Sequence, residues 1–140
     1  MKKDYSTILL SIFRRKGGEG DRTKIIDDNN RVKYDHLFPT LEQGEKSLLI
    51  CIDGDKNFFL LTNKRVIIKD ETQIIFIPLL EISSVRPAFD EEFKKNILNK
   101  KKFTKLSIKT SNNNEYVCNL EMGLPYTGIL QALSYIAGKE

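Results

Sequence analysis

The densest group of like charges in this 140-residue sequence is a run of lysines between Phe93 and Lys109, with no acidic residue among them. Ammonium groups that lie close together attract phosphate and other anions. The run therefore leaves two alternatives open, a solvated loop beside a polar strand face or a surface that binds an anion or an anionic lipid. Its members are Lys94, Lys95, Lys100, Lys101, Lys102, Lys105 and Lys109.

Groups that could carry out catalysis are few. His36 is the sole histidine, and its position in a predicted loop or helical turn favours a surface residue over a general base. The glycines of residues 17–20 follow a predicted helix and lack the Lys-Ser/Thr ending of a phosphate loop. The acidic groups at 27–28 and 90–92 lack the spacing of a calcium loop and indicate solvated charge. We therefore expect no enzyme activity, no metal site and no cofactor.

Two cysteines, Cys51 and Cys118, lie in apolar strand-like runs with no partner at ligand spacing. This pattern favours buried thiols over a disulfide or a metal site. The apolar stretch from Ile8 to Phe13 is short and has no small-residue cleavage site after it, unlike a signal peptide. No segment approaches the roughly 18 apolar residues of a membrane-spanning helix. These patterns predict a cytoplasmic protein, and they leave association with a membrane surface open.

The length fits one domain, and the net charge of +4 permits contact with an anionic surface without requiring it. The pattern divides the chain into an N-terminal amphipathic helix in residues 1–16, a linker and loop in residues 17–40, and a folded domain in residues 41–138. We expect the domain to fold without residues 1–24, because the polar linker separates the helix from every predicted strand.

One face of the N-terminal helix is apolar at the i, i+3, i+4 spacing. A short isolated helix does not keep such a face in water, so the domain, a second copy of the chain or a membrane must cover it. We expect a homo-oligomer whose contact includes this face. The residues of this candidate interface are Tyr5, Ile8, Leu9, Ile12 and Phe13.

Residues 41–138 are typical of seven short strands followed by one helix. The strands are rich in Ile, Val, Phe and Leu and are separated by Gly, Asn or Asp. Their close spacing leaves no room for crossover helices and predicts antiparallel pairing. A C-terminal helix starting near Pro125 has an apolar stripe that could cover the open end of the sheet. The predicted strands are 47–53, 57–62, 65–69, 73–79, 81–86, 103–110 and 115–120.

This order of elements resembles the bacterial pleckstrin-homology (PH)-like domains, and three segments resemble them too. Gln43-Gly44-Glu45-Lys46 is similar to the Pro-Gly-Glu segment before their first strand. Phe59–Ile68, which contains Thr62-Asn63-Lys64-Arg65, is similar to their second hairpin, and Ile77–Val85 is similar to their Ile-Pro-Leu segment. The resemblance implies a mainly β fold with α: a PH-like barrel of seven antiparallel strands in two sheets, capped by a C-terminal helix.

The resemblance implies a non-enzymatic interaction module that binds a protein partner or itself. Phosphoinositide-binding PH domains place basic residues on the first hairpin, whereas residues 51–57 are net acidic here. An alternative is a peripheral membrane-surface module that binds anionic lipid through the Lys94–Lys109 run and the N-terminal helix. A nucleic-acid partner is less favoured, because only Phe93 and Phe103 are available near the lysines for base stacking. For the hairpin, we expect Asn63 to supply a left-handed backbone.

Overall fold

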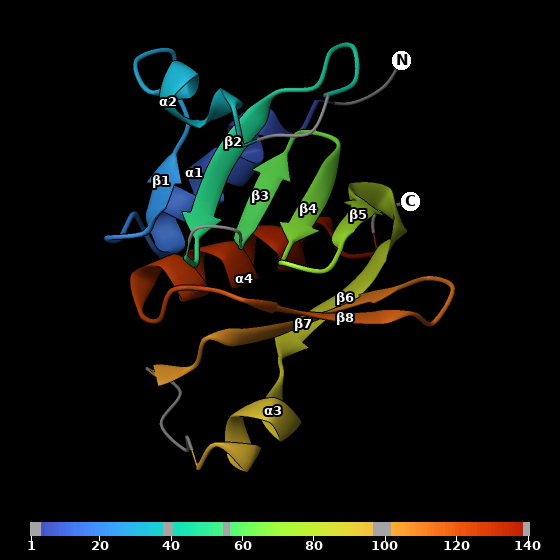
Figure 1. The fold of residues 1–140 in the computed structure, drawn as a ribbon. Coiled ribbons are helices and arrows are strands. Elements are labelled where there is room, and N and C mark those ends of the chain that lie inside the picture. The colour runs from blue at the N-terminus through green and yellow to red at the C-terminus, as the bar shows by residue number, and fades with distance from the viewer. Residues whose placement is uncertain (1–3, 38–40, 55–56, 97–101, 139–140) are drawn as a thin grey trace.

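The structure is a computed structural model, and it describes residues 4–37, 41–54, 57–96 and 102–138. These residues form two antiparallel sheets of five and three strands together with four helices, the last of them at the C-terminal end (Figure 1). No strand pairing within this described part of the chain joins the two sheets into a closed barrel. The fold is therefore mixed α and β, with two separate sheets.

The first sheet has the strand order β1-β2-β3-β4-β5. Its first strand was not predicted, because three residues are too few to show a strand periodicity. Pro78 ends the last strand at the edge of the sheet, where its missing N–H removes no hydrogen bond from the ladder. The strands are β1 (Thr23–Ile25), β2 (Ser47–Ile52), β3 (Phe58–Thr62), β4 (Arg65–Lys69) and β5 (Ile74–Pro78).

The second sheet has the order β6-β7-β8, and all of its pairs are antiparallel. A 3-10 helix, η1 (Leu79–Glu81), carries the chain from the first sheet to the second. All seven predicted strands are confirmed as β2 to β8. The strands of this sheet are β6 (Ile82–Pro87), β7 (Lys105–Thr110) and β8 (Glu115–Asn119).

The main core lies between the sheets and two helices, α1 (Ser6–Lys16) and α4 (Leu124–Ile136). Ile129, Leu133 and Ile136 of α4 have no exposed surface, so the predicted C-terminal stripe is confirmed as core. None of the helices in the described ranges is long and apolar enough to cross a lipid bilayer.

The apolar face of α1 packs on α4 and belongs to this core. Leu9 and Phe13 have no exposed surface and Ile12 is buried, while Tyr5 and Ile8 are half-buried against the same cluster. The prediction that this face is an interface between copies is therefore corrected, because the chain itself covers it. The helix could not be recognised as core from its sequence, since its partner α4 lies at the other end of the chain.

Two glycines allow α1 and α4 to approach closely. A Cβ atom on Gly17 would lie 2.2 Å from the Leu124 carbonyl oxygen and 2.5 Å from the Gly128 Cα atom. A Cβ atom on Gly128 would lie 2.7 Å from the Phe13 ring. Real Cβ atoms do not come so close to other heavy atoms, so any larger residue at Gly17 must push the two backbones apart.

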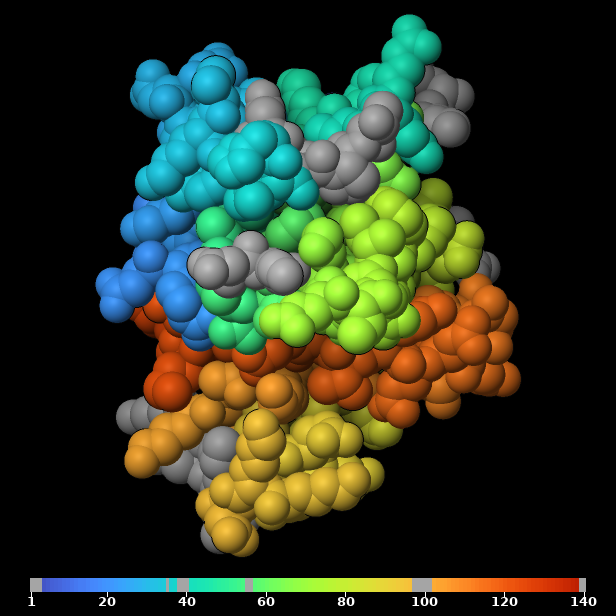
Figure 2. Space-filling view, in the orientation of Figure 1, coloured from blue at the N-terminus to red at the C-terminus, as the bar shows by residue number. Residues whose placement is uncertain are grey.

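A second, smaller core covers the outer face of the first sheet. Ile50, Leu60 and Ile67 have no exposed surface on that face, and Ile26 and Tyr34 pack on it from the segment that was predicted as linker. This segment contains α2 (Arg31–Asp35) and lies over β2 and β3 in the space-filling view (Figure 2). The prediction of residues 17–40 as a linker and loop is thus wrong for β1 and for the residues, Ile26 and Tyr34, that pack on the first sheet.

We predict that removal of residues 1–24 abolishes cooperative thermal unfolding, contrary to the expectation from sequence. The deletion exposes the core under α1 and removes two of the three residues of β1. Losing one buried Leu or Phe side chain costs about 2–5 kcal/mol, and the total stability of a small domain is about 5–15 kcal/mol. Phe13→Ala alone should cost about 3–5 kcal/mol and the exposed Arg14→Ala less than about 0.5 kcal/mol. A truncated chain that still melts cooperatively would show that the two sheets fold without α1.

We also predict that Gly17→Ala lowers the free energy of unfolding by about 1–3 kcal/mol, the usual cost of inserting a methyl group where there is no space. The expected loss follows from the contact that a Cβ atom on Gly17 would make with the backbone of α4. Gln131→Ala, on the exposed side of α4, is the matched control. Chemical denaturation measures both, and equal stability of the two variants would contradict the close approach.

Candidate functional site

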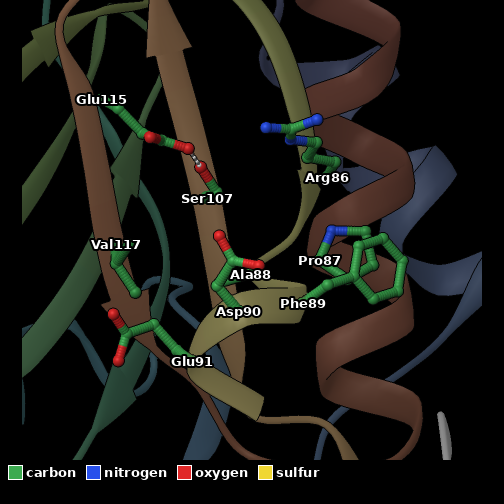
Figure 3. A pocket seen from close by; sticks show the side chains of 9 residues that line it. All are labelled: Arg86, Pro87, Ala88, Phe89, Asp90, Glu91, Ser107, Glu115 and Val117. Atoms are coloured by element: carbon green, nitrogen blue, oxygen red, sulfur yellow. Dashed lines mark hydrogen bonds between the residues drawn. The ribbon is translucent and has the colours of Figure 1, made fainter. Parts of the chain in front are cut away.

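A cavity of about 190 Å³ lies between the outer face of the second sheet and α3 (Phe89–Lys94). The three strands form its floor, and the chain from the end of β6 through the first turn of α3 forms its wall (Figure 3). We call this cavity the α3 pocket. Its lining residues are Arg86, Pro87, Ala88, Phe89, Asp90, Glu91, Ser107, Glu115 and Val117.

The floor of the α3 pocket follows from the alternation of side chains along a strand. Leu106 and Ile108 of β7 belong to the main core, so Ser107 between them faces the other side of the sheet. The strand register places Arg86 and Val117 opposite Ser107 on the two neighbouring strands. One charged, one polar and one apolar side chain therefore form a row across the floor.

A buried carboxylate holds the wall of the pocket against β7. Glu92 has no exposed surface, and its Oε1 atom accepts hydrogen bonds from the backbone N–H groups of Thr104 and Lys105 at 2.8 and 2.5 Å. These bonds offset part of the cost of burial, while the other carboxylate oxygen, Oε2, is buried with no hydrogen-bond partner among the described residues. The prediction of residues 90–92 as solvated charge is therefore wrong for Glu92. Asp90 and Glu91 lie in the first turn of α3, where carboxylates interact favourably with the helix dipole.

Aromatic rings extend the pocket into an exposed apolar surface. The Phe89 ring lies edge-on to the buried Phe103, with 5.8 Å between ring centroids, and 5.9 Å from the Phe93 ring. Phe93 is 50% exposed, Phe89 36% and Val117 45%. Exposed apolar groups that lie together, rather than singly, are typical of interaction surfaces.

The charge of the pocket lining is negative, with three carboxylates and one guanidinium. Glu115 accepts a hydrogen bond from the Ser107 hydroxyl. In Figure 3 the Glu91 carboxylate lies on the side of β8, and the Arg86 guanidinium lies on the side of β6. Within the described residues, no three or more His, Cys, Asp or Glu side chains are grouped so that they could hold a metal ion.

The fold divides the predicted basic run between elements. Lys105 and Lys109 lie on β7 on either side of Ser107 and on the same face as the α3 pocket. Lys105 is half-buried, and its Nζ atom donates a hydrogen bond to Asn119 at 2.9 Å. Lys109 is exposed.

The other described lysines of the run lie outside that sheet. Lys94 is the last residue of α3 and lies 4.0 Å from Glu91, and Lys95 follows it; both are exposed. Lys102 is exposed as well. The remaining two predicted residues, Lys100 and Lys101, lie outside the described residues. The sequence alone did not indicate that the run would be divided between α3 and β7.

The α3 pocket itself was not predicted, although a signal for its floor was present. Alternation along the predicted strands 81–86, 103–110 and 115–120 places Arg86, Ser107 and Val117 on the polar faces of their strands. The wall gives no such signal, because it depends on the hydrogen bonds that Glu92 accepts from the start of β7.

A second cavity, of about 690 Å³, lies where the start of α1, the β3–β4 turn and η1 meet. Its walls include the segment that resembles the PH-like hairpin. The Glu45 side chain has no exposed surface and accepts hydrogen bonds from Arg65 Nε at 2.9 Å and from Thr62 Oγ1 at 2.7 Å. These bonds tie the segment before β2 to the β3–β4 turn, so the polar residues of the motif have a structural role.

Asn63 has a different role from the one predicted. The described non-glycine residues with positive φ are Asn96 and Asn113, so Asn63 does not adopt the left-handed backbone. Its side chain instead accepts a hydrogen bond from the Lys46 N–H at 2.8 Å and donates one to the Gly44 carbonyl at 3.2 Å. The role of Asn63 is therefore to form hydrogen bonds through its side-chain amide, which joins the β3–β4 turn to the segment before β2.

Both cysteines are free and buried, as predicted. Burial raises the pKa of the Cys51 thiol, and burial raises the pKa of Cys118 to about 12. A thiol is a nucleophile or a metal ligand only as the thiolate. Cys118 therefore stays protonated and inert at neutral pH.

Comparisons of this chain with protein-family models, with curated proteins and with solved structures found no match.

The structure predicts that Glu45 makes stability dependent on acid pH. Burial of Glu45 opposes its ionisation, but hydrogen bonds from Arg65 and Thr62 outweigh that effect and lower its pKa below the ordinary value of 4.5. Because the folded-state pKa is lowered, the carboxylate stabilises the fold fully above the ordinary pKa of 4.5. This stabilisation is lost as the pH falls through the folded-state pKa. We expect Glu45→Gln to cost about 1–3 kcal/mol at neutral pH and progressively less as the pH falls below 4.5.

Urea denaturation at a series of pH values measures this difference. Glu42→Gln is the control, because Glu42 is 59% exposed and lies 3.9 Å from both Lys64 and Arg65, where an ion pair contributes little. A difference between wild type and Glu45→Gln that does not change with pH would contradict the stabilising role of the carboxylate.

Proposed function

We propose that this chain is a non-enzymatic interaction module with PH-like architecture, which binds a positively charged segment of a partner protein in the α3 pocket. The architecture is supported by the chain order of the elements: the antiparallel meander β2–β5, the antiparallel meander β6–β8, and then α4. The proposal is also supported by the hydrogen bonds between Glu45 and the β3–β4 turn, because they hold the hairpin motif against the segment before β2.

The observation that carries the function is the composition of the α3 pocket. Phe89 and Val117 provide exposed apolar surface, and Asp90, Glu91 and Glu115 surround it with carboxylates. Lysine and arginine side chains combine an apolar stem with a cationic end, so they can contact both kinds of surface at once. An arginine fits this chemistry best, because its planar guanidinium forms paired hydrogen bonds with carboxylates.

The size of the pocket agrees with a single side chain of a partner and not with a large ligand. Small-molecule sites usually enclose about 300–1,000 Å³, and this cavity has about 190 Å³. A second copy of the chain also satisfies the chemistry, because the chain has a net charge of +4. The proposal therefore includes both a different protein and self-association through this pocket.

We predict that a short peptide with one central arginine binds at the α3 pocket. The peptide acetyl-Gly-Arg-Gly-amide is the probe, and its citrulline counterpart, which keeps the shape and lacks the charge, is the matched control. Titration followed by NMR should shift the amide signals of Ser107, Val117 and Phe89 with the arginine peptide and much less with the citrulline peptide. Replacing Asp90 with Asn together with Glu115 with Gln should weaken binding by about tenfold or more, since each charged hydrogen bond contributes about 1.5–3 kcal/mol.

The variant Glu71→Gln, an exposed carboxylate in the β4–β5 turn, should bind the arginine peptide like wild type. Equal shifts with the two peptides, or shifts spread over all acidic regions of the surface, would contradict the proposed function.

A further inference from the structure

The C-terminal end of α1 and the N-terminal end of α4 form one corner of the molecule, at the left of Figure 1. Gly17 lies directly against the first turn of α4 at Leu124 and Gly128. The Glu121 carboxylate accepts hydrogen bonds from the N–H groups of Asp21 and Arg22 at 2.8 and 2.9 Å. The loop after α1 and the loop before α4 are therefore fixed side by side.

Two large apolar side chains are exposed at this corner. Met122 is 52% exposed and Leu124 is 62% exposed. Gly123 between them has φ 91°, a conformation that glycine adopts readily and that turns the chain sharply into α4. The buried stripe of α4 begins only at Pro125 and Tyr126, so the exposed pair contributes little to the core.

Three basic residues end α1, directly before Gly17, which lies against Leu124. Arg14, Arg15 and Lys16 are all exposed, and none forms an ion pair within the described ranges. Three carboxylates lie in the loops of the same corner: Glu121 is held by backbone N–H groups and by the Thr23 hydroxyl, Glu19 accepts the Ile25 N–H, and Asp21 is exposed. The corner thus holds three exposed cations at the end of α1 and two exposed apolar side chains at the start of α4.

We propose that this corner contacts an anionic membrane surface, with Met122 and Leu124 entering the headgroup region and Arg14, Arg15 and Lys16 held at the lipid phosphates. A bilayer interface supplies negative charge and an apolar layer within a few ångströms of each other. Proteins that bind single-stranded nucleic acid usually stack the bases on aromatic side chains, and the exposed pair here is aliphatic. The proposal concerns a surface distinct from the α3 pocket and does not depend on peptide binding there.

This contact differs from the membrane alternative that the sequence suggested. That alternative used the apolar face of the N-terminal helix, which the fold buries against α4, and the lysines between 94 and 109. Only the basic end of the helix remains available, and its apolar partner is a loop more than 100 residues away in the sequence. The two sets of basic residues can be separated by substitution.

Cosedimentation with vesicles tests the proposal. The full chain should sediment with equimolar phosphatidylcholine and phosphatidylglycerol, should not sediment with phosphatidylcholine alone, and should be released by salt, which screens the cations. Replacing Arg14, Arg15 and Lys16 with Gln should weaken binding by about fivefold for each cation removed. Replacing Met122 and Leu124 with Ser should weaken it by about tenfold or more.

Two control variants keep the test specific, and the thermal melt of each variant verifies its fold. Val32→Ser removes an apolar group that is 84% exposed and lies in α2, and it should not change binding. Lys94→Gln with Lys95→Gln removes two cations of the basic run, and it should reduce binding less than the change at Arg14–Lys16.

A fluorescence measurement reports the contact directly, because the chain contains no tryptophan. The single change Leu124→Trp should shift tryptophan emission to the blue when anionic vesicles are added, and Val32→Trp should show no shift. The proposal is overturned by any of three outcomes: no binding to anionic vesicles, equal binding to neutral vesicles, or binding that is lost only in the Lys94 and Lys95 variant.

Discussion

The contact between α1 and α4 is the constraint on which the rest of the structure depends. The Phe13 ring lies against Gly128, and Gly17 lies against the backbone of Leu124, so neither glycine position has space for a side chain. This contact closes the main core, because Leu9 and Phe13 of α1 and Ile129 and Leu133 of α4 have no exposed surface. It also fixes the loop after α1 beside the loop before α4, through the bonds to Glu121.

The two sheets use their outer faces differently. On the first sheet the outer face is apolar, and residues of the segment around α2 cover it in a second core. On the second sheet the outer face carries Arg86, Ser107 and Val117, and α3 covers it only in part. A sheet face that is mixed in character and incompletely covered can admit a side chain from another molecule, whereas a fully covered apolar face contributes only to stability.

The arrangement of polar groups explains why similar residue types have different roles. Glu45 and Glu92 are both buried, and each is held by protein donors, so their charges serve the fold. Asp90, Glu91 and Glu115 surround a cavity that a cation could enter. Burial, and not residue type, therefore separates structural carboxylates from those available to a partner.

The amino-acid sequence by itself determined the seven strands β2 to β8, the two long helices and the burial of both cysteines. These features depend on local periodicity and turn residues, which act over a few neighbouring positions.

Only the tertiary structure decided which faces meet. The apolar stripe of α1 does not specify whether α4, another chain or a lipid covers it, because the hydrophobic effect has no direction. The α3 pocket depends in the same way on a contact between Glu92 and the start of β7, and β1 depends on its pairing with β2. Such contacts join residues that are distant in the chain. They form only when the chain folds, so a local sequence pattern cannot predict them.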